Sequence, residues 1–225
     1  WLFNLSRKLV KILLNQSLKA VDLGDINPNT SVLEWLRGNQ FVGTKEGCAS
    51  GDCGACTAVV GELASINNKS EIQYKTINTC IALAYSLIGK HLITVEGLSE
   101  GTKLHPVQKA MVIENGSQCG FCTPGFIMSL FAMYHNEKSV KLSKINDALS
   151  GNLCRCTGYK PIISAAFSAL EKRQQDPSDF YERHQEQFIS SLTELSDDSN
   201  ISLSYMKDGK KINFDAPSNL NDLSK

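Results

Sequence analysis

Short runs of β-branched and apolar residues, several with a rough polar alternation, mark the first part of the chain and predict β-strands. The runs cover residues 9–14, 18–23, 57–63, 71–77 and 91–95. Residues 15–17 separate the first two runs, and a polar turn around residues 67–69 separates the next two. Each of these pairs is therefore expected to form a hairpin.

Two short helices are expected among these strands. Ser31 stands three residues before Glu34, which is the spacing of a capping box, so a helix is predicted to begin there and to end at Gly38. An apolar run over residues 81–85 predicts the second helix. The order of hairpin, helix, hairpin, helix and strand describes a β-grasp domain.

From about residue 104 the hydrophobic period changes from two to 3.6, which predicts helices. We expect four: one from His105–Pro106 to Asn115–Gly116, one over residues 126–134, one over residues 144–149 capped by Ser143, and one from residue 161 or 162 to about residue 172. Packed antiparallel, they would form a four-helix bundle. The fold class is therefore expected to be α+β.

Beyond residue 172 the composition becomes polar. Residues 174–200 are expected to form a linker that contains one amphipathic helical turn around residues 188–195. A hairpin is expected next, with strands over residues 201–205 and 211–214, followed by a helix that starts within residues 216–223. These last elements resemble the opening of a further domain.

Length and charge narrow the class of protein. The 225 residues, 42% of them hydrophobic, suffice for one or two domains with buried cores. The 23 basic residues are balanced by 23 acidic ones, so no nucleic-acid surface is indicated. No apolar run approaches the roughly 18 residues of a membrane span, and the opening residues lack the apolar core of a signal peptide. We therefore expect a cytoplasmic protein whose partners are neither nucleic acid nor membrane.

Eight cysteines are the unusual feature of the composition, and three kinds of site compete for them. Disulfides suit small secreted chains, and structural zinc usually takes paired C-x2-C motifs. Cys48, Cys53 and Cys56 instead have the spacing C-x4-C-x2-C, with Cys80 further on. This is the spacing that holds a [2Fe-2S] cluster in plant-type ferredoxins. It favours iron–sulfur chemistry, with zinc and disulfides as the alternatives.

The other four cysteines lie in turns between the expected helices. Cys119 and Cys122 separate the first two helices, and Cys154 and Cys156 separate the last two. An antiparallel bundle would bring these turns together and form a second site of four thiols. The four histidines are scattered along the sequence, so none is expected to bind a metal or to act as a general base.

Three motifs in this order closely resemble the iron–sulfur part of the molybdenum hydroxylase family, and most nearly the small iron–sulfur/FAD subunit of bacterial xanthine dehydrogenases. The motifs are Thr44–Thr57, Gln118–Gly125 and Gly151–Tyr159. The resemblance covers about residues 9–172 densely and the last twenty or so weakly. Among iron–sulfur clusters, zinc and disulfides, the resemblance strongly favours two iron–sulfur clusters.

The resemblance implies a site for each cluster and a route for electrons. The ligands of the two [2Fe-2S] clusters would be Cys48, Cys53, Cys56 and Cys80 for one, and Cys119, Cys122, Cys154 and Cys156 for the other. Gln118 and Cys156 would contact the molybdopterin of a large partner subunit, where a purine is hydroxylated. Electrons would then pass through the helical-domain cluster and the plant-type cluster to FAD, which reduces NAD. No catalytic residue for the purine is expected in this chain, and the complex would be a dimer of heterodimers.

The expected domains follow from these elements. They are a β-grasp [2Fe-2S] domain over residues 1–95, a helical [2Fe-2S] domain over residues 96–173, a linker over residues 174–200 and the incomplete beginning of an FAD-binding domain over residues 201–225. The last part has no glycine-rich phosphate loop, so this chain alone is not expected to hold FAD. The competing interpretations are the same subunit of an aldehyde oxidase or another azaheterocycle hydroxylase, a stand-alone [2Fe-2S] carrier, and a zinc module for assembly.

Overall fold

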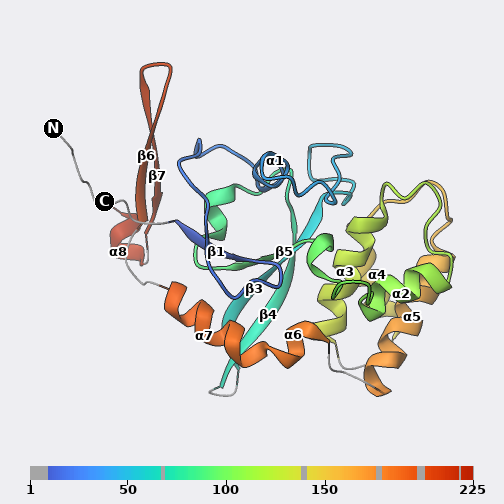
Figure 1. Cartoon of the computed structure of the whole chain (residues 1–225). Coiled ribbons are helices and arrows are strands. Elements are labelled where there is room, and N and C mark those ends of the chain that lie inside the picture. Colours follow the sequence, from blue (N-terminus) through green and yellow to red (C-terminus); the bar gives the residue numbers. More distant parts are fainter. Residues whose placement is uncertain are drawn as a thin grey trace.

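The computed structural model describes residues 10–66, 69–137, 141–175, 179–196, 201–217 and 219–224. In this part of the chain a β-sheet lies beside a group of helices, and a separate hairpin stands at the end of the molecule opposite those helices (Figure 1). Among the described residues, no helix combines the length and the apolar character that crossing a bilayer requires. The α+β class predicted from the sequence is confirmed.

A five-stranded sheet forms the first half, in the order β2-β1-β5-β3-β4. The strands are β1 (Lys11–Leu14), β2 (Val21–Asp22), β3 (Thr57–Ile66), β4 (Lys69–Asn78) and β5 (His91–Ile93). β1 pairs in parallel with β5, and all other neighbours are antiparallel. The mixed sheet agrees with the expected ferredoxin-like domain.

Two strands are shorter than the sequence predicts. Of residues 18–23 only Val21–Asp22 pair with β1. β5 ends at Ile93, because the side-chain oxygen of Asn15 accepts a hydrogen bond from the Thr94 N–H at 2.8 Å and a 3₁₀ turn, η2 (Val95–Gly97), follows. The predicted positions Leu9, Asn67 and Asn68 lie outside the described residues.

The helix predicted after Ser31 is present as α1 (Val32–Gly38). Ser31 Oγ accepts from the Glu34 N–H at 3.1 Å, and the Glu34 carboxylate accepts from the Ser31 N–H at 2.7 Å, so both halves of the capping box form. The helix predicted over residues 81–85 is instead a 3₁₀ turn, η1 (Ala84–Leu87). It starts later because the amides of Ile81 and Ala82 close a turn onto the carbonyl of Asn78.

The helices of the second half are α2 (Pro106–Ile113), α3 (Thr123–Asn136), α4 (Leu142–Leu149) and α5 (Lys160–Gln175). All four predicted helices are therefore present. One cap was predicted wrongly: α4 begins after Lys141, so Ser143 lies inside its first turn and does not cap it. α3 begins three residues earlier than expected, with Pro124 in its first turn.

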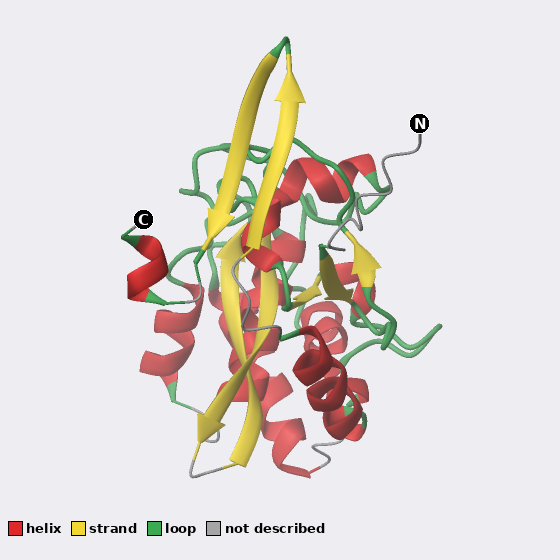
Figure 2. Cartoon of the chain, turned by 90° about the vertical axis from the view of Figure 1, so that its left-hand side faces the viewer, coloured by secondary structure: helices red, strands yellow, loops and turns green. Residues whose placement is uncertain are grey.

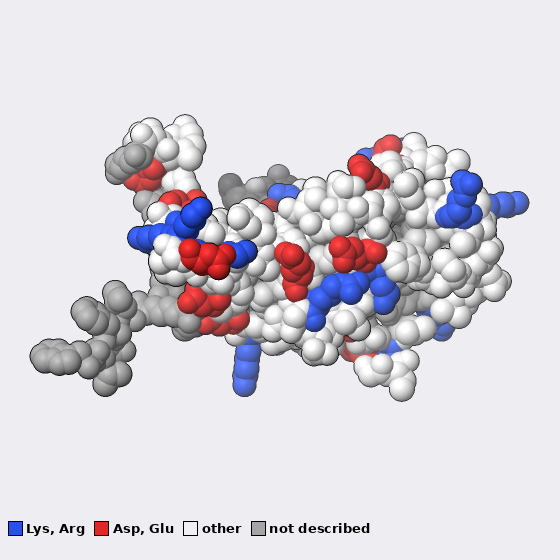
Figure 3. All heavy atoms as spheres, turned by 90° about the horizontal axis from the view of Figure 1, so that it is seen from above, with Lys and Arg blue, Asp and Glu red and all other residues white. Residues whose placement is uncertain are grey.

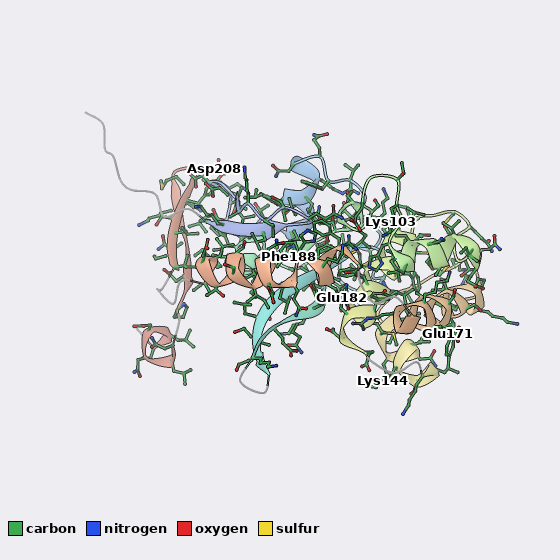
Figure 4. All side chains as sticks on the ribbon, turned by 60° about the horizontal axis from the view of Figure 1, so that its bottom comes forward. Lys103, Lys144, Glu171, Glu182, Phe188 and Asp208 are labelled. Atoms are coloured by element: carbon green, nitrogen blue, oxygen red, sulfur yellow. The ribbon has the colours of Figure 1, made fainter. Side chains whose placement is uncertain are left out.

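Of the linker expected over residues 174–200, residues 180–195 are almost entirely helical: the helical turn expected around residues 188–195 is present, and helical structure begins earlier than expected. This segment forms α6 (Phe180–Arg183) and α7 (Gln185–Leu195), and Figure 4 shows α7 lying across the strands with Phe188 in its middle. The side chains of Tyr181, Phe188 and Leu192 are buried. A polar segment thus covers the sheet because its few apolar residues recur at helical spacing.

The predicted hairpin and final helix are present as β6 (Ile201–Lys207), β7 (Lys210–Ala216) and α8 (Leu220–Leu223). The hairpin strands are longer than expected, and the hairpin projects from the rest of the molecule (Figure 2). At its base the ring of Phe214 lies 5.3 Å from the ring of Tyr85. The hairpin therefore contacts the sheet half of the chain.

The two faces of the sheet are covered by different elements. Alternate residues Ile12, Leu14, Val60 and Leu92 pack toward α1 and η1. Their neighbours Leu13, Val59 and Ile93 belong to a second core cluster that also contains the buried residues of α2–α7. The helices and the sheet thus share one continuous core.

Contacts between α3 and the edge strand β4 fix the helical half on the sheet. Tyr74 and Phe131 meet edge to face, with ring centroids 5.7 Å apart. The side-chain amide of Asn136 donates to the Tyr74 carbonyl at 2.6 Å and accepts from the Tyr74 N–H at 3.4 Å. Asn136 therefore pairs with an edge strand as a neighbouring strand would.

Candidate metal centres

The loop between α1 and β3 carries the first three thiols and points backbone amides at one of them. Cys48 Sγ accepts from the N–H groups of Ser50, Asp52 and Cys53 at 3.5, 3.3 and 3.4 Å. Hydrogen bonds from Ser50 lower the pKa of the Cys48 thiol to about 6. The loop therefore stabilises an anionic sulfur.

The fourth thiol reaches this loop through the sheet. Cys56 precedes β3 and Cys80 follows β4, and pairing of Thr57 with Asn78 brings them together, with their sulfurs 3.3 Å apart. Burial raises the pKa of Cys80 to about 11. A Cβ on Gly47 would lie 2.8 Å from Cys53 Sγ, so only glycine lets that sulfur approach the backbone so closely.

The second group of thiols comes from the two interhelical turns, as predicted. Cys119 lies beside Cys156, and Cys122 lies beside Cys154. Burial raises the pKa of Cys122 to about 12. Burial would also raise the pKa of Cys154, but hydrogen bonding by Thr157, whose hydroxyl oxygen is 3.1 Å from the sulfur, lowers it overall.

The spacing of the sulfurs separates a two-iron site from a single zinc ion. All eight cysteines are free thiols. Of the described residues, only His105, His135 and Asp179 place three ligand atoms within 4.8 Å of one another, so no three sulfurs do. A tetrahedral zinc would hold four sulfurs roughly 3.8 Å apart, given its Zn–S bonds of about 2.3 Å. The sulfurs instead lie in close pairs, such as Cys56 with Cys80, and no third sulfur of the described residues is equally near to both. This arrangement suits a cluster of two irons, each bound by two thiolates.

The two thiol groups contact each other through the backbone. The Leu153 N–H, next to Cys154, donates to the carbonyl of Cys53 at 2.9 Å. The ring of Phe121 also lies against Gly47, 3.7 Å from where a Cβ would stand. One hydrogen bond therefore joins Cys53 of the first thiol group to Leu153, the residue next to Cys154 of the second group.

The residues predicted to meet molybdopterin lie on the surface. Gln118 and Cys156 are exposed. Two apolar side chains of the same turns are also open to solvent, Phe121 at 49% and Leu153 at 56%. The outer side of the second thiol group is thus accessible to a partner.

A buried cluster that the sequence analysis missed joins the helices to α6. Asp179 caps α6, and its Oδ2 lies 2.8 Å from Nε2 of both His105 and His135. The contact of His135 with Asp179 is close but is not aligned as a hydrogen bond. Burial opposes ionisation, but the two imidazoles hold the pKa of Asp179 far below its usual range.

His105 has both ring nitrogens engaged. Its Nδ1 accepts from the Val107 N–H at 3.2 Å and so caps α2, at the helix start that the sequence predicts. This requires the proton on Nε2, facing Asp179. A metal would need the Nε2 lone pair, so these contacts describe a hydrogen-bonded junction. No pattern in the sequence links residues so far apart.

Family models match both halves of the chain. Residues 25–85 match the 2Fe-2S iron-sulfur cluster binding domain, and residues 94–167 match a [2Fe-2S] binding domain. The fold and the two thiol groups therefore define a protein with two [2Fe-2S]-binding domains.

Curated and solved relatives narrow this class. The chain is 47% identical to the xanthine dehydrogenase of Emericella nidulans over 148 residues, 66% of this chain and 11% of that protein. It is 46% identical to aldehyde oxidase 1 of Bos taurus over 143 residues, 63% of this chain and 10% of that protein. A chain of quinoline 2-oxidoreductase from Pseudomonas putida 86 superimposes with a TM-score of 0.62 and 28% identity, covering 76% of this chain and 98% of that one.

These relatives place the chain in the molybdenum hydroxylase family, of which it is an iron–sulfur unit. It spans about a tenth of the length of the curated relatives, 11% and 10% respectively.

Proposed function

We propose that this chain is the electron-transfer unit of a molybdenum-dependent hydroxylase, with xanthine dehydrogenase as the first candidate for the whole complex. The observation that carries the proposal is the hydrogen bond from Leu153 to Cys53, 2.9 Å long, between two groups of four thiols. A relay needs two centres held in fixed contact, and this bond joins them.

The proposed ligands are the eight cysteines, Cys48, Cys53, Cys56 and Cys80 for one [2Fe-2S] cluster and Cys119, Cys122, Cys154 and Cys156 for the other. When bound, the clusters supply one-electron steps. The chain's own residues hold the thiolates in place, point amides at Cys48 and keep the two loops in contact. Rigid helices and strands on both sides limit the rearrangement that a change of charge would cause.

The order of transfer is proposed from the two ends of the molecule. Gln118 and Cys156 are exposed at the second thiol group, which supports a contact there with molybdopterin on a large partner subunit. Residues 201–225 are proposed as the start of an FAD-binding domain, and their hairpin packs on Tyr85 of the sheet half. Electrons would thus pass from molybdenum to the second cluster, then to the first, to FAD and to NAD.

Substrate identity is not carried by this part of the protein. The chain is as similar to an aldehyde oxidase as to a xanthine dehydrogenase, at 46% and 47% identity. Assaying the intact complex with xanthine and with aldehydes decides between the two: we expect NAD reduction with xanthine. Turnover of aldehydes alone would make aldehyde oxidation the activity and leave the electron-transfer role unchanged.

A free electron carrier is the second candidate, and it would need an extended acidic docking face. The face in Figure 3 carries acidic and basic side chains interspersed, with a wide uncharged area. This mixture favours a permanent subunit. We expect the chain to co-purify with a larger molybdenum-bearing chain, whereas a lone, stable monomer would favour the free carrier.

Metal analysis tests the clusters themselves. The anaerobically purified chain should contain two irons and two acid-labile sulfides for each cluster, with visible absorption and two paramagnetic signals after reduction. Cys53→Ser should remove one signal and Cys156→Ser the other, because each variant deletes a ligand of a different group. A colourless protein with two zinc ions would overturn the proposal.

A further inference from the structure

A buried asparagine between the two thiol groups carries an inference beyond their ligands. Asn152 stands two residues before Cys154, and its side chain is 4% exposed. It lies in the turn after α4, where its own N–H donates to the Leu149 carbonyl at 2.9 Å. No ligand of either proposed cluster is an asparagine, so its burial needs a separate explanation.

The side chain of Asn152 directs its donors across the boundary between the two halves and uses its acceptor within the helical half. Its Nδ2 donates to the Gly54 carbonyl at 3.0 Å and to Thr57 Oγ1 at 3.2 Å, both in the first cysteine loop. Its Oδ1 accepts from Ser129 Oγ of α3 at 2.6 Å. Thr57 Oγ1 itself donates to Gly54 at 2.7 Å, so the network is complete.

Two glycines let the backbones meet at this network. A Cβ on Gly54, whose φ is +69°, would overlap the Gly151 carbonyl, and a Cβ on Gly125 would overlap the Gly54 carbonyl. The loop with Cys53 and Cys56 is thereby pressed against the turns that carry Cys122 and Cys154. Asn152 satisfies the buried polar groups that this close approach takes out of water.

We infer that Asn152 is a positioning residue that sets the spacing of the two clusters and aligns the Leu153–Cys53 hydrogen bond between them. The inference rests on the proposed electron-transfer function. Its physical basis is that Leu153 follows Asn152 directly, so anchoring the Asn152 side chain to Gly54 and Thr57 fixes the direction of the next N–H. Without this anchor, each cysteine loop would keep its own fold, but the position of one loop relative to the other would no longer be fixed.

The test replaces Asn152 in the full chain with both clusters in place. Asn152→Leu keeps the shape of the side chain and removes its hydrogen bonds. We expect the mutual splitting of the two paramagnetic signals in the fully reduced protein to be lost or strongly reduced, with both signals retained. We also expect faster hydrogen exchange at the Leu153 amide. Thr57→Val removes one of the two acceptors of the Asn152 amide, together with the Thr57–Gly54 bond, and should give the same changes more weakly.

Two matched asparagines serve as controls. Asn78 donates to the Gly51 carbonyl at 2.7 Å within the first half alone, and Asn136 bonds Tyr74 across the two halves away from the sulfurs. Asn78→Ala and Asn136→Ala should leave the splitting and the Leu153 exchange unchanged. Equal loss of splitting in Asn136→Ala would overturn the inference, because any loosening of the halves would then suffice.

The result that overturns the inference differs from the one that overturns the proposed function. Wild-type protein without two iron–sulfur signals contradicts the function itself. Wild-type signals that split each other, together with an unchanged splitting in both Asn152→Leu and Thr57→Val, contradict only the role of Asn152.

Discussion

Burial and hydrogen bonding give the thiols of each group different proton affinities. In the first group, bonds from Ser50 lower the pKa of Cys48 to about 6, whereas burial raises that of Cys80 to about 11. In the second group, burial raises the pKa of Cys122 to about 12, whereas Thr157 lowers that of Cys154. The thiols with raised pKa are therefore expected to lose their protons only when iron binds, so cluster assembly should release protons.

His91 makes stability depend on pH. Its ring is buried, its Nε2 donates to the Asn15 carbonyl at 2.6 Å, and it stacks on Phe188 with ring centroids 4.5 Å apart. Burial lowers the pKa of His91 from 6.5 to about 4, so the unfolded chain binds a proton that the folded chain rejects between those values. The free energy of unfolding should therefore fall as pH drops from about 6.5 to 4, by at most about 3 kcal/mol.

Urea unfolding at pH 7, 5.5 and 4.5 measures this effect. His91→Gln can still donate to Asn15 but does not titrate, so its loss of stability over the same range should be smaller by about that amount. Comparing the two proteins cancels any common effect of acid on the clusters. Parallel pH profiles would show that His91 is not the group responsible.

At the scale of single residues, a contact can be predicted from the sequence when its two residues are close together along the chain. The grouping of Cys48, Cys53 and Cys56 could be predicted because their spacing within one loop is a local pattern, and their role as ligands stays a prediction. The contact of Asn152 with Gly54 joins residues 98 positions apart, and that of His105 with Asp179 joins residues 74 apart. Such contacts follow from the packing of whole elements and leave no periodic signal.

Among the elements, those with local chemical signals were predicted best. The capping box of Ser31 and Glu34 formed as expected, and His105 with Gln108 forms a second one before α2. Errors arose where a tertiary contact overrides local preference. Asn15 ends β5 early, and the turn at Asn78 delays η1.

α7 was predicted only in part. The polar residues of 174–200 predict a linker with one helical turn around residues 188–195, yet α7 begins at Gln185 and Phe188 is fully buried against His91 and Tyr181. Phe188→Ala should lower the free energy of unfolding by about 3–5 kcal/mol and speed hydrogen exchange throughout α7, because the deleted ring leaves a cavity under the helix. Chemical denaturation and exchange measured by mass spectrometry check both effects.

Thr193→Ala on the same helix is the matched control. Thr193 is exposed, and its hydroxyl donates to the Ile189 carbonyl of its own helix at 2.7 Å. It should change stability by less than about 0.5 kcal/mol. If Phe188→Ala were as mild as Thr193→Ala, α7 would be a loosely attached segment, as its composition suggests.

At the scale of the whole molecule, a change of period predicts two modules, and the core joins them. The hydrophobic period changes near residue 104, but one buried cluster contains Val59 and Ile93 of the sheet together with residues of α2–α7. The division at residue 95 stays a prediction about domains. Periodicity marks the elements of each half, whereas the faces they turn toward each other emerge only on packing.

A shared core makes the stability of the two iron–sulfur sites interdependent. Phe131 of α3 is fully buried, and its ring meets Tyr74 of β4 as well as His105 and Tyr181. Phe131→Ala should destabilise the chain by about 3–5 kcal/mol. Because the cavity borders both halves, the signals of both clusters should be lost together at a lower temperature than in the wild type, as a single cooperative transition.

Met206→Ala is the control. Met206 is 63% exposed on the hairpin, so this variant should leave the temperature of that transition unchanged. Survival of the plant-type signal after loss of the other would show that the halves unfold independently, and the contact between the loops would then persist only while both remain folded.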